Sequence, residues 1–568
     1  MEALAAVFTP LGIWQALDKE SIQVGEHLGL CAQTRIFVTF KGLRAHAKTD
    51  TMKNIVGIAL SAAVLSSAWA QSEKPDMHWY HSAPSKTNMG ISLDEAYQMG
   101  LPAKKQIIVA VVDGGTDVNH EDLNQVLWTN PGEIAGNGID DDGNGYIDDI
   151  HGWNFIGGAD GRNVGGDNME KVRLYAKLRL QFENLEAEDI NSQDYLVYQE
   201  LKMDIEEDRA RYQKIMDRMT NLQETMVMIQ EKTGKEDPSA DEVSAVELDS
   251  ADNNLMVKII SMAMSKGGES FLSLKGQITG QADQVGNMLN YHYNPDLNTR
   301  EIVGDDYSNP WERHYGNADV IGPDAGHGTH VAGIIAGKRG NNIGMDGVCD
   351  AAQIMVVRVV PDGDERDKDV ANGIIYAVDN GAQIINMSFG KGTNWYKPCV
   401  DSAVAYALRK GVLLVHAAGN DGANNDIVPK YPNDSLNGGF ASNWIEIGAS
   451  QIDAKHLATS FSNFGVANVD VFSPGRDIYS SIPNNEYAYF NGTSMAAPCA
   501  AGVAALVWSR YPHLTAQQVK ACLMEGSFPV KGKVILPGTD KQKVKLKDIC
   551  VSGALVNAKK ALEMAATL

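Results

Sequence analysis

Short apolar runs rich in β-branched residues alternate with stretches of helical periodicity along most of this 568-residue chain. Runs that are apolar throughout are typical of strands buried on both faces of a parallel sheet. Helices between such strands act as crossover connections. We therefore expect an α/β fold, doubly wound, with a mainly parallel sheet and helices on both faces. The expected strands are Ile107 to Val112, Ile354 to Val360, Ile384 to Phe389, Val412 to Val415 and Ile445 to Ala449, and the expected helices are Val370 to Asp379, Val400 to Lys410, Met495 to Arg510 and Ala516 to Met524.

The pattern changes between residues 165 and 310. β-Branched runs become scarce there, and apolar residues from Tyr198 to Ile229 recur at steps of three and four, interrupted at Asp208. This spacing predicts a long amphipathic helix, alone or in a hairpin. Its apolar seam packs on a partner helix or, as the alternative, forms a groove for another protein. We expect 165–310 to be a helical insertion between two parts of the α/β domain, 106–164 and 311–568.

Residues 52–70 read MKNIVGIALSAAVLSSAWA, with one Lys, an apolar run and a small-x-small triplet. This pattern predicts a signal peptide cleaved after Ala70, and a buried core helix is the alternative. Residues 1–51 are then a non-native leader or an over-extended start, and 71–105 an N-terminal segment. No Cys follows the cleavage site, so we expect no lipid anchor. The predicted location is periplasmic or extracellular, without a stable membrane anchor.

Charge and cysteine usage exclude other classes of protein. The formal net charge of -23 and pI near 5.0 disfavour nucleic acid as a partner, because phosphate binding requires clustered Lys and Arg. The six Cys include no CxxC pair, which argues against a zinc site and allows at most one or two disulfides. The oligomeric state does not follow from the sequence.

Three segments carry side chains suited to nucleophilic catalysis: VAVVDGGTDVNHEDL around Asp113, DAGHGTHVAGIIAG around His327 and FNGTSMAAPCAAGVAAL around Ser494. A serine hydroxyl is a weak nucleophile near neutral pH, so it needs an imidazole as base and a carboxylate to orient that imidazole. Asp113 ends a predicted strand, where open α/β sheets gather their ligands. Ser494 opens a predicted helix, so its own amide is free to face an oxyanion.

Together these segments resemble the subtilisin-like serine peptidase family, which has the same Asp, His, Ser order. The resemblance implies hydrolysis of peptide bonds through an acyl-enzyme on Ser494, with His327 as general base and acid and Asp113 orienting His327. It also implies that Asn420, at the end of VLLVHAAGN, donates its side-chain amide to the oxyanion.

The resemblance also predicts how substrate binds. Ser388, Phe389 and Gly390 match the segment whose backbone pairs with an extended substrate, so proteins or peptides are the expected substrates. Gly114 stands where many relatives have Ser or Thr. The short segment 71–105 leaves no room for a full inhibitory propeptide. We hypothesise that calcium and the insertion reduce the need for one, or that the insertion covers the active site as a lid.

Two alternative functions remain to be compared with this reading. An exported scaffold or binding protein could retain the fold without activity and use the insertion to engage a partner. An α/β-hydrolase esterase would need GxSxG and the order Ser, Asp, His, whereas Ser494 lies in GTSMA and comes last. The motif order argues against the esterase.

An acidic loop predicts a calcium site. The run DDDGNGYIDD spaces oxygen ligands at alternating positions and resembles the first part of an EF-hand loop, although His151 stands at the twelfth position. A solvated acidic turn is the alternative. The family resemblance suggests a second, weaker calcium site at Asp122 and Asn341, where an ordinary loop is equally acceptable. The candidate ligands in the acidic loop are Asp140, Asp142, Asn144, Asp148 and Asp149.

Overall fold

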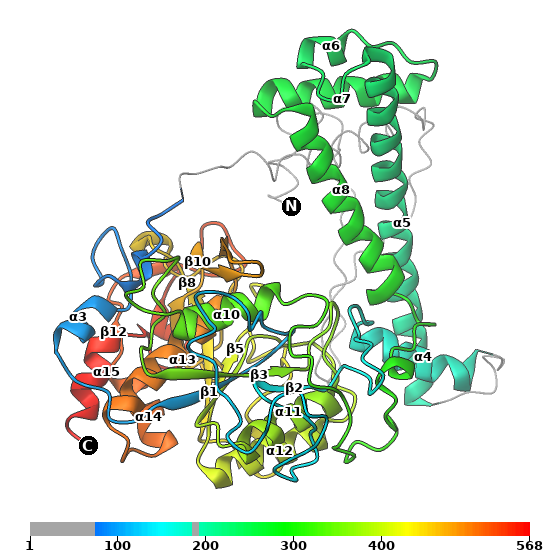
Figure 1. Cartoon of the computed structure of the whole chain (residues 1–568). Coiled ribbons are helices and arrows are strands. Elements are labelled where there is room, and N and C mark those ends of the chain that lie inside the picture. Colours follow the sequence, from blue (N-terminus) through cyan, green and yellow to red (C-terminus); the bar gives the residue numbers. More distant parts are fainter. Residues whose placement is uncertain (1–73, 184–191) are drawn as a thin grey trace, which may run out of the picture. The chain divides into compact units, whose positions relative to one another are not determined.

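The computed structural model describes residues 74–183 and 192–568 (Figure 1). The predicted leader (1–51) and signal peptide (52–70) lie outside these residues, as does Cys31. None of the helices in the described part is long and apolar enough to cross a membrane.

A nine-stranded sheet forms the centre of the α/β domain and confirms the predicted fold class. β1 (Ile107–Asp113) lies between β3 and β4, and it pairs in parallel with both. All other pairings are parallel except that of β12 with β15. From edge to edge the strands are β12 (Phe528–Pro529), β15 (Ala554–Leu555), β9 (Val471–Pro474), β8 (Trp444–Ser450), β5 (Leu413–Ala417), β4 (Ile384–Met387), β1, β3 (Ala352–Arg358) and β2 (Gly152–Asn154).

Two predicted strands end earlier than their apolar runs suggest. β3 stops at Arg358 because the amides of Val359 and Val360 both donate to the backbone oxygen of Asp113, at 2.9 and 3.2 Å. β4 stops at Met387, which frees Ser388 and Phe389 from the sheet. The short strands β2, β9, β12 and β15 were not predicted, because runs of two to four residues carry too little periodicity.

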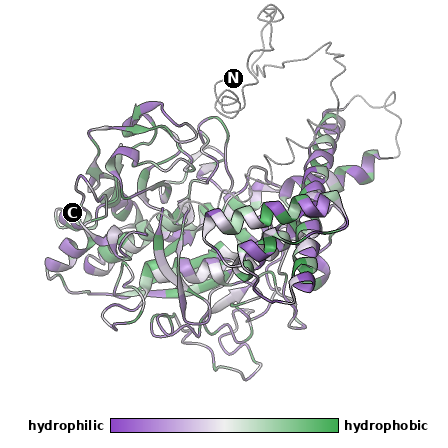
Figure 2. Ribbon diagram, turned by 90° about the horizontal axis from the view of Figure 1, so that it is seen from above, coloured by the Kyte–Doolittle hydropathy of each residue, from purple (hydrophilic) through white to green (hydrophobic). Residues whose placement is uncertain are grey.

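Helices cover both faces of the sheet. One face packs against α10 (Gly326–Ala336), α13 (Thr493–Arg510), α14 (Ala516–Glu525) and α15 (Ala558–Ala565), and the other against α11 (Asp367–Asp379) and α12 (Lys397–Lys410). β1 divides its side chains accordingly, with Val109 and Val111 in one core and Ala110 and Val112 in the other. Green, apolar residues therefore run through the strands and helices of this domain, and purple, polar residues are frequent on the loops around it (Figure 2).

Helices also fill most of the stretch predicted as an insertion. α5 (Gln193–Thr233) begins at the capping side chain of Ser192 and ends at Gly234, which has a φ of 66°. Its apolar seam packs against α4, α7 and α8. Asp208, which interrupts the seam, forms a 2.9 Å ion pair with Lys171 of α4. The helices of this stretch are α4 (Glu170–Phe182), α5, α6 (Ala240–Ser244), α7 (Ala251–Gly267), α8 (Phe271–Asn287), the π-helix at Met288–His292 and α9 (Arg300–Val303).

Smaller elements complete the described chain. Trp79, Tyr80, Ile91 and Leu93 of the N-terminal segment are buried in the same core as α13. The cysteines Cys349, Cys399, Cys499, Cys522 and Cys550 are all buried and free, so no disulfide forms among the described residues. The remaining elements are α3 (Leu93–Gln98), the pairs β6 (Ser435–Leu436) and β7 (Gly439–Phe440), β10 (Ile478–Ile482) and β11 (Glu486–Phe490), β13 (Lys533–Ile535) and β14 (Lys543–Lys545), and 3-10 turns at Trp79–His81, Ala454–His456 and Leu546–Asp548.

Candidate active site

Asp113 and His327 form a hydrogen-bonded pair at the carboxyl end of β1. His327 Nδ1 lies 2.8 Å from Asp113 Oδ1, which also accepts the Gly114 amide at 2.7 Å. The Asp113 side chain is 4% exposed and that of His327 is 43% exposed, so the carboxylate is buried behind a ring that solvent still reaches. Gly328 allows this approach, because a Cβ there would lie 2.1 Å from the Gly115 oxygen.

Asp113 controls the protonation of His327. Burial opposes the charged imidazolium, but the charge of Asp113 and its hydrogen bond outweigh burial, and the pKa of His327 is raised above its ordinary value. The same hydrogen bond places a proton on Nδ1 in the neutral ring. Nε2 then has a free lone pair, as a general base requires.

Arg358 stabilises the turn that follows Asp113 through hydrogen bonds, a role that sequence reasoning missed. It pairs with Asp113 across β1 and β3, and its guanidinium donates to the Gly114 oxygen at 2.8 Å and to Asn154 Oδ1 at 3.1 Å. The residue is 1% exposed, and burial lowers its pKa to about 10. A buried Arg at a strand end is visible in the sequence only as an isolated charge in an apolar run.

Ser494 lies in the first turn of α13 and is tied to the end of β4. Its Oγ donates to the Ser388 oxygen at 3.0 Å, and Ser388 Oγ donates back to the Ser494 oxygen at 2.8 Å. Asn386 Nδ2 in turn donates to Ser388 Oγ at 2.9 Å. The predicted nucleophile and the predicted substrate-pairing segment are therefore held together.

Asn420 follows β5 with its side-chain amide fixed in orientation. Oδ1 accepts from the Thr493 amide at 2.9 Å and from Thr493 Oγ1 at 3.0 Å. A Cβ built on Gly492 would lie 3.5 Å from both Asn420 Nδ2 and the Ser494 amide nitrogen. Two donors from different elements thus converge on one small region beside Ser494.

A cavity of about 460 Å³ opens at Ser494. Ser494, Asn420 and the segment 388–390 line it, so the structure brings these predicted residues together. The segment 363–365, which leads into α11, also lines it. Met169 and Lys171, from the start of the predicted insertion, contribute as well, and nothing in their sequence context had indicated this.

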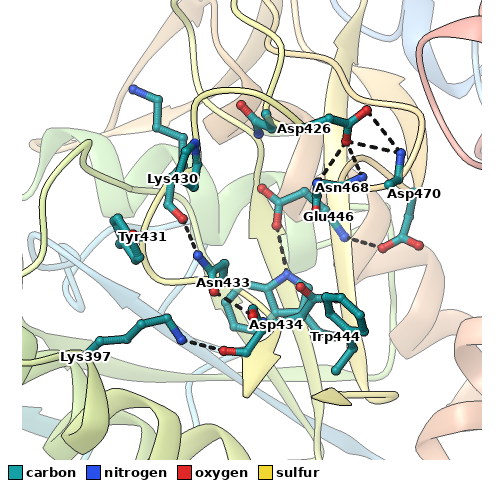
Figure 3. A pocket seen from close by; sticks show the side chains of 15 residues that line it. Lys397, Asp426, Lys430, Tyr431, Asn433, Asp434, Trp444, Glu446, Asn468 and Asp470 are labelled. Atoms are coloured by element: carbon teal, nitrogen blue, oxygen red, sulfur yellow. Dashed lines mark hydrogen bonds between the residues drawn. The ribbon is translucent and has the colours of Figure 1, made fainter. Parts of the chain in front are cut away.

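A second cavity, of about 330 Å³, shares only Lys430 with the first (Figure 3). Its walls carry the carboxylates of Asp426, Asp434, Glu446 and Asp470. Glu446 Oε2 accepts the indole N–H of Trp444 at 2.8 Å. Across the described residues, no three of these carboxylates come close enough to one another to hold one metal ion together. We assign this cavity no catalytic chemistry.

The acidic loop brings together only part of the predicted calcium ligands. Carboxylate oxygens of Asp140 and Asp142 lie within 4.8 Å of one another and of a Glu133 oxygen. Glu133 precedes the loop and was missed, because EF-hand spacing looks only downstream. Gly145, with a φ of 95°, turns the chain within the loop. Oxygen-rich carboxylates at this spacing fit a hard cation such as calcium.

The other predicted loop residues are engaged by protein groups. Asp148 accepts the amides of Gly136 and Gly138 at 2.7 and 2.8 Å. Asp149 accepts Tyr376 Oη at 2.6 Å and Asn130 Nδ2 at 2.7 Å. Asn144 donates to Asp142 Oδ2 and Asp149 Oδ2, at 3.2 and 3.1 Å. Asp148 and Asp149 thus order the loop through hydrogen bonds.

Asp122 and Asn341, the residues of the second predicted calcium site, are in direct contact. Asn341 Nδ2 donates to Asp122 Oδ1 at 2.6 Å. Asp122 Oδ2 is buried without a hydrogen-bond partner, and burial raises the pKa of this carboxyl. The side chains meet as the resemblance implied, and their role in binding an ion stays a prediction.

Comparisons with known proteins identify the family to which the chain belongs. A family model described as the subtilase family matches residues 104–553. The thermophilic serine proteinase of Bacillus sp. (strain AK1) is 39% identical over 217 residues, which cover 38% of this chain and 49% of that protein. Thermitase of Thermoactinomyces vulgaris is 38% identical over 208 residues, which cover 36% of this chain and 69% of thermitase. The chain thus spans about half the length of the first relative.

A solved structure of a protease from Pseudoalteromonas arctica PAMC 21717 aligns with 87% of this chain and 100% of its own, at 18% identity and a TM-score of 0.46. The family match covers well over half of the chain, and its limits enclose Asp113, His327 and Ser494. The chain therefore belongs to the subtilase family of serine-type endopeptidases.

Proposed function

We propose that this protein is an exported endopeptidase that hydrolyses peptide bonds through an acyl-enzyme on Ser494. The observation that carries the proposal is the convergence of two fixed donors, Asn420 Nδ2 and the Ser494 amide, at a serine that opens into a cavity. Such donors favour the negative charge that develops on a carbonyl oxygen during acyl transfer. The Asp113–His327 pair supplies the base that this serine needs.

The mechanism follows from these positions. Ser494 Oγ turns from the Ser388 oxygen toward His327 when substrate binds, and Nε2 takes its proton as Oγ attacks the scissile carbonyl carbon. Asn420 and the Ser494 amide stabilise the oxyanion. His327 then protonates the leaving amine, and the acyl-enzyme forms. Water, deprotonated by His327, hydrolyses that ester and regenerates Ser494.

Substrate binding uses the two segments that face the cavity. An extended peptide lies between residues 388–390 and 363–365 and pairs with backbone groups, in the manner of an added strand. Because β4 ends at Met387, the backbone of Ser388 to Gly390 is outside the sheet ladder, and the Ser388 oxygen becomes available for such pairing when Ser494 Oγ turns away. Proteins and peptides are the substrate class.

Calcium binding is part of the proposal. Glu133, Asp140 and Asp142 would hold the ion, which would stabilise the loop between β1 and β2 by neutralising three converging carboxylates. Export is supported by the signal-peptide pattern at 52–70.

The deciding experiment is fluorophosphonate labelling combined with cleavage of an unfolded protein. We expect wild type to react with the fluorophosphonate and to cleave the unfolded protein, and Ser494→Ala to do neither. Ser509→Ala is the matched control, because Ser509 lies near the other end of α13 and donates to Leu506 within the helix. If Ser494→Ala still labels, the nucleophile is misassigned. If wild type neither labels nor cleaves, the inactive scaffold becomes the better description.

A further inference from the structure

The start of the helical insertion forms part of the cavity wall. Met169 and Lys171 line the same cavity as Ser494, and Glu170 between them is 1% exposed. A carboxylate this deeply buried requires charged partners. The partners of Glu170 connect the start of α4 to the segments that line the cavity.

Glu170 holds the residue that follows the substrate-pairing segment. Lys391 comes directly after Gly390, and its Nζ donates to Glu170 Oε2 at 2.8 Å and to the Glu365 oxygen at 2.7 Å. The same Nζ lies 2.7 Å from Asp367 Oδ1. The Lys391 and Glu170 side chains are each 1% exposed, so this pair is shielded from solvent.

Charges around the pair agree with a permanent ionic contact. Burial disfavours both charged forms, but each partner offsets this for the other. The pKa of Glu170 is lowered to about 2 by Lys391 and Arg173, and that of Lys391 is raised by Glu170 and Asp367.

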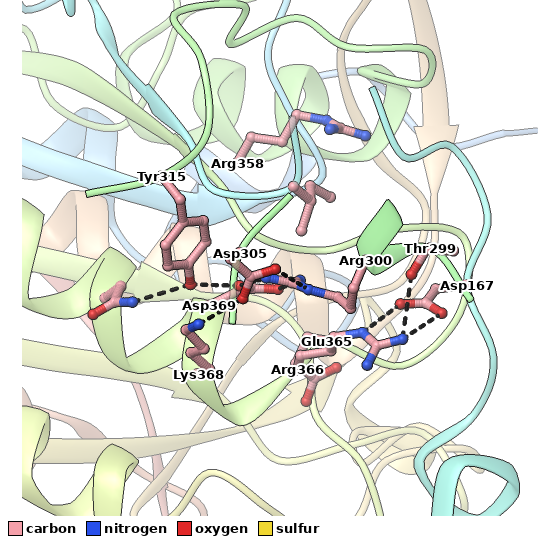
Figure 4. A network of polar contacts seen from close by, with 12 residues as sticks. Asp167, Thr299, Arg300, Asp305, Tyr315, Arg358, Glu365, Arg366, Lys368 and Asp369 are labelled. Carbon is pink, nitrogen blue, oxygen red and sulfur yellow. Dashed lines mark hydrogen bonds and ion pairs between the residues drawn. The ribbon is translucent and has the colours of Figure 1, made fainter. Parts of the chain in front are cut away.

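The next turn of α4 contacts the other lining segment, 363–365. Arg173 donates to Glu170 Oε2 at 2.6 Å and to the backbone oxygens of Asp364 and Glu365, both at 3.1 Å. Both peptide-facing segments of the cavity are thus fixed to the first turns of one helix. Neighbouring pairs, including Arg366–Asp167 and Arg300–Asp369, join the same insertion to α11 (Figure 4). Within the described part of the chain, these four residues form no hydrogen bond or ion pair with residues 388–391.

We propose that Glu170 is a positioning residue for substrate: through Lys391 it holds the Ser388–Gly390 segment in the geometry that pairs with an extended peptide. The inference rests on the proposed peptidase function. It gives the insertion a role in binding substrate, because its first helix fixes the spacing between the two segments that flank the peptide. Glu170 acts through Lys391 and does not touch the reacting atoms.

The test compares Glu170→Gln with Asp369→Asn, using an extended peptide substrate and concentrations of active enzyme titrated with fluorophosphonate. Glu170→Gln keeps the side-chain shape and removes the charge. We expect its KM to rise about tenfold or more while kcat and the rate of fluorophosphonate labelling change much less, since the small probe forms no strand-like backbone pairing with residues 388–390. Asp369→Asn breaks a buried pair of the same kind and should lower Tm with KM unchanged.

Lys391→Met should reproduce the rise in KM, and the double variant should show no more than either single variant. An unchanged KM in Glu170→Gln, an equal rise in Asp369→Asn, or multiplying effects in the double variant would each overturn the inference. If Glu170→Gln yields no labelled enzyme, Arg173→Lys is measured by the same criteria, with a smaller rise in KM expected. Failure of the wild type to label would overturn the proposed function itself.

Discussion

Replacing Asn420 by Leu tests the oxyanion assignment directly. The variant keeps the approximate side-chain volume. It removes one of the two donor nitrogens that would lie 3.5 Å from a Cβ built on Gly492. A hydrogen bond to a charged group contributes about 1.5–3 kcal/mol, and each 1.36 kcal/mol is tenfold in rate. The loss should therefore be about 10- to 150-fold. Because two bonds to Thr493 hold the amide in place before substrate arrives, we expect the upper part of this range.

The assay is kcat and KM per fluorophosphonate-titrated site. The loss should appear in kcat with KM nearly unchanged, because the oxyanion forms during acyl transfer and is absent from the bound substrate. Thr493→Val removes one bond to Asn420 Oδ1 and leaves both donors, so its loss should stay below about tenfold. A change of only a few-fold in Asn420→Leu, or a loss expressed wholly in KM, would refute the assignment of Asn420 as a donor.

Three further predictions concern ionisation and metal binding. Because attack by Ser494 needs neutral His327, whose pKa is raised, kcat/KM should fall on the acid side with a midpoint above 6.5, and a midpoint below that value would contradict the Asp113 pairing. Burial raises the pKa of Glu365 from 4.5 to about 8, so the unfolded chain loses this proton at lower pH than the folded protein. Each pH unit between 4.5 and about 8 then lowers the free energy of unfolding of wild type by about 1.4 kcal/mol. Urea unfolding should therefore show the stability of Glu365→Gln increasing relative to that of wild type from pH 5 to pH 8. An equal difference in stability at both pH values would contradict the raised pKa of Glu365. Calcium should raise the Tm of wild type and leave the Tm of Asp142→Asn nearly unchanged. If a chelator lowers the Tm of both proteins equally, the Asp142 loop is not the calcium site.

The positions of Asp113 and Ser494 at the ends of secondary-structure elements were predictable because they depend on local sequence. Asp113 ends a strand whose apolar run is unbroken, and Ser494 begins a helix whose small residues allow nearly complete burial. Local pattern therefore placed both at element ends, where side chains and free amides reach a ligand. The long α5 was predicted for the same reason, since its periodicity extends over many turns.

Contacts between distant segments could not be predicted in this way. Glu133 joins Asp140 and Asp142 only through the folded loop. Glu170 and Lys391 are 221 positions apart, and each looks like an ordinary surface charge in the sequence. Arg358 is similar, because an isolated Arg gives no sign that its guanidinium braces the turn after Asp113.

The sequence by itself determined the α/β class and the family, and it predicted the residues of the proposed chemistry, because periodicity and motifs are properties of short segments. Tertiary structure alone decided the walls of the cavity at Ser494. Ser494, the 388–390 segment and the first turn of α4 meet there because the sheet order and the packing of α4 bring them together. A buried charge contacts its partner only in the folded chain. The free-energy cost of leaving that charge unpaired keeps those segments in place.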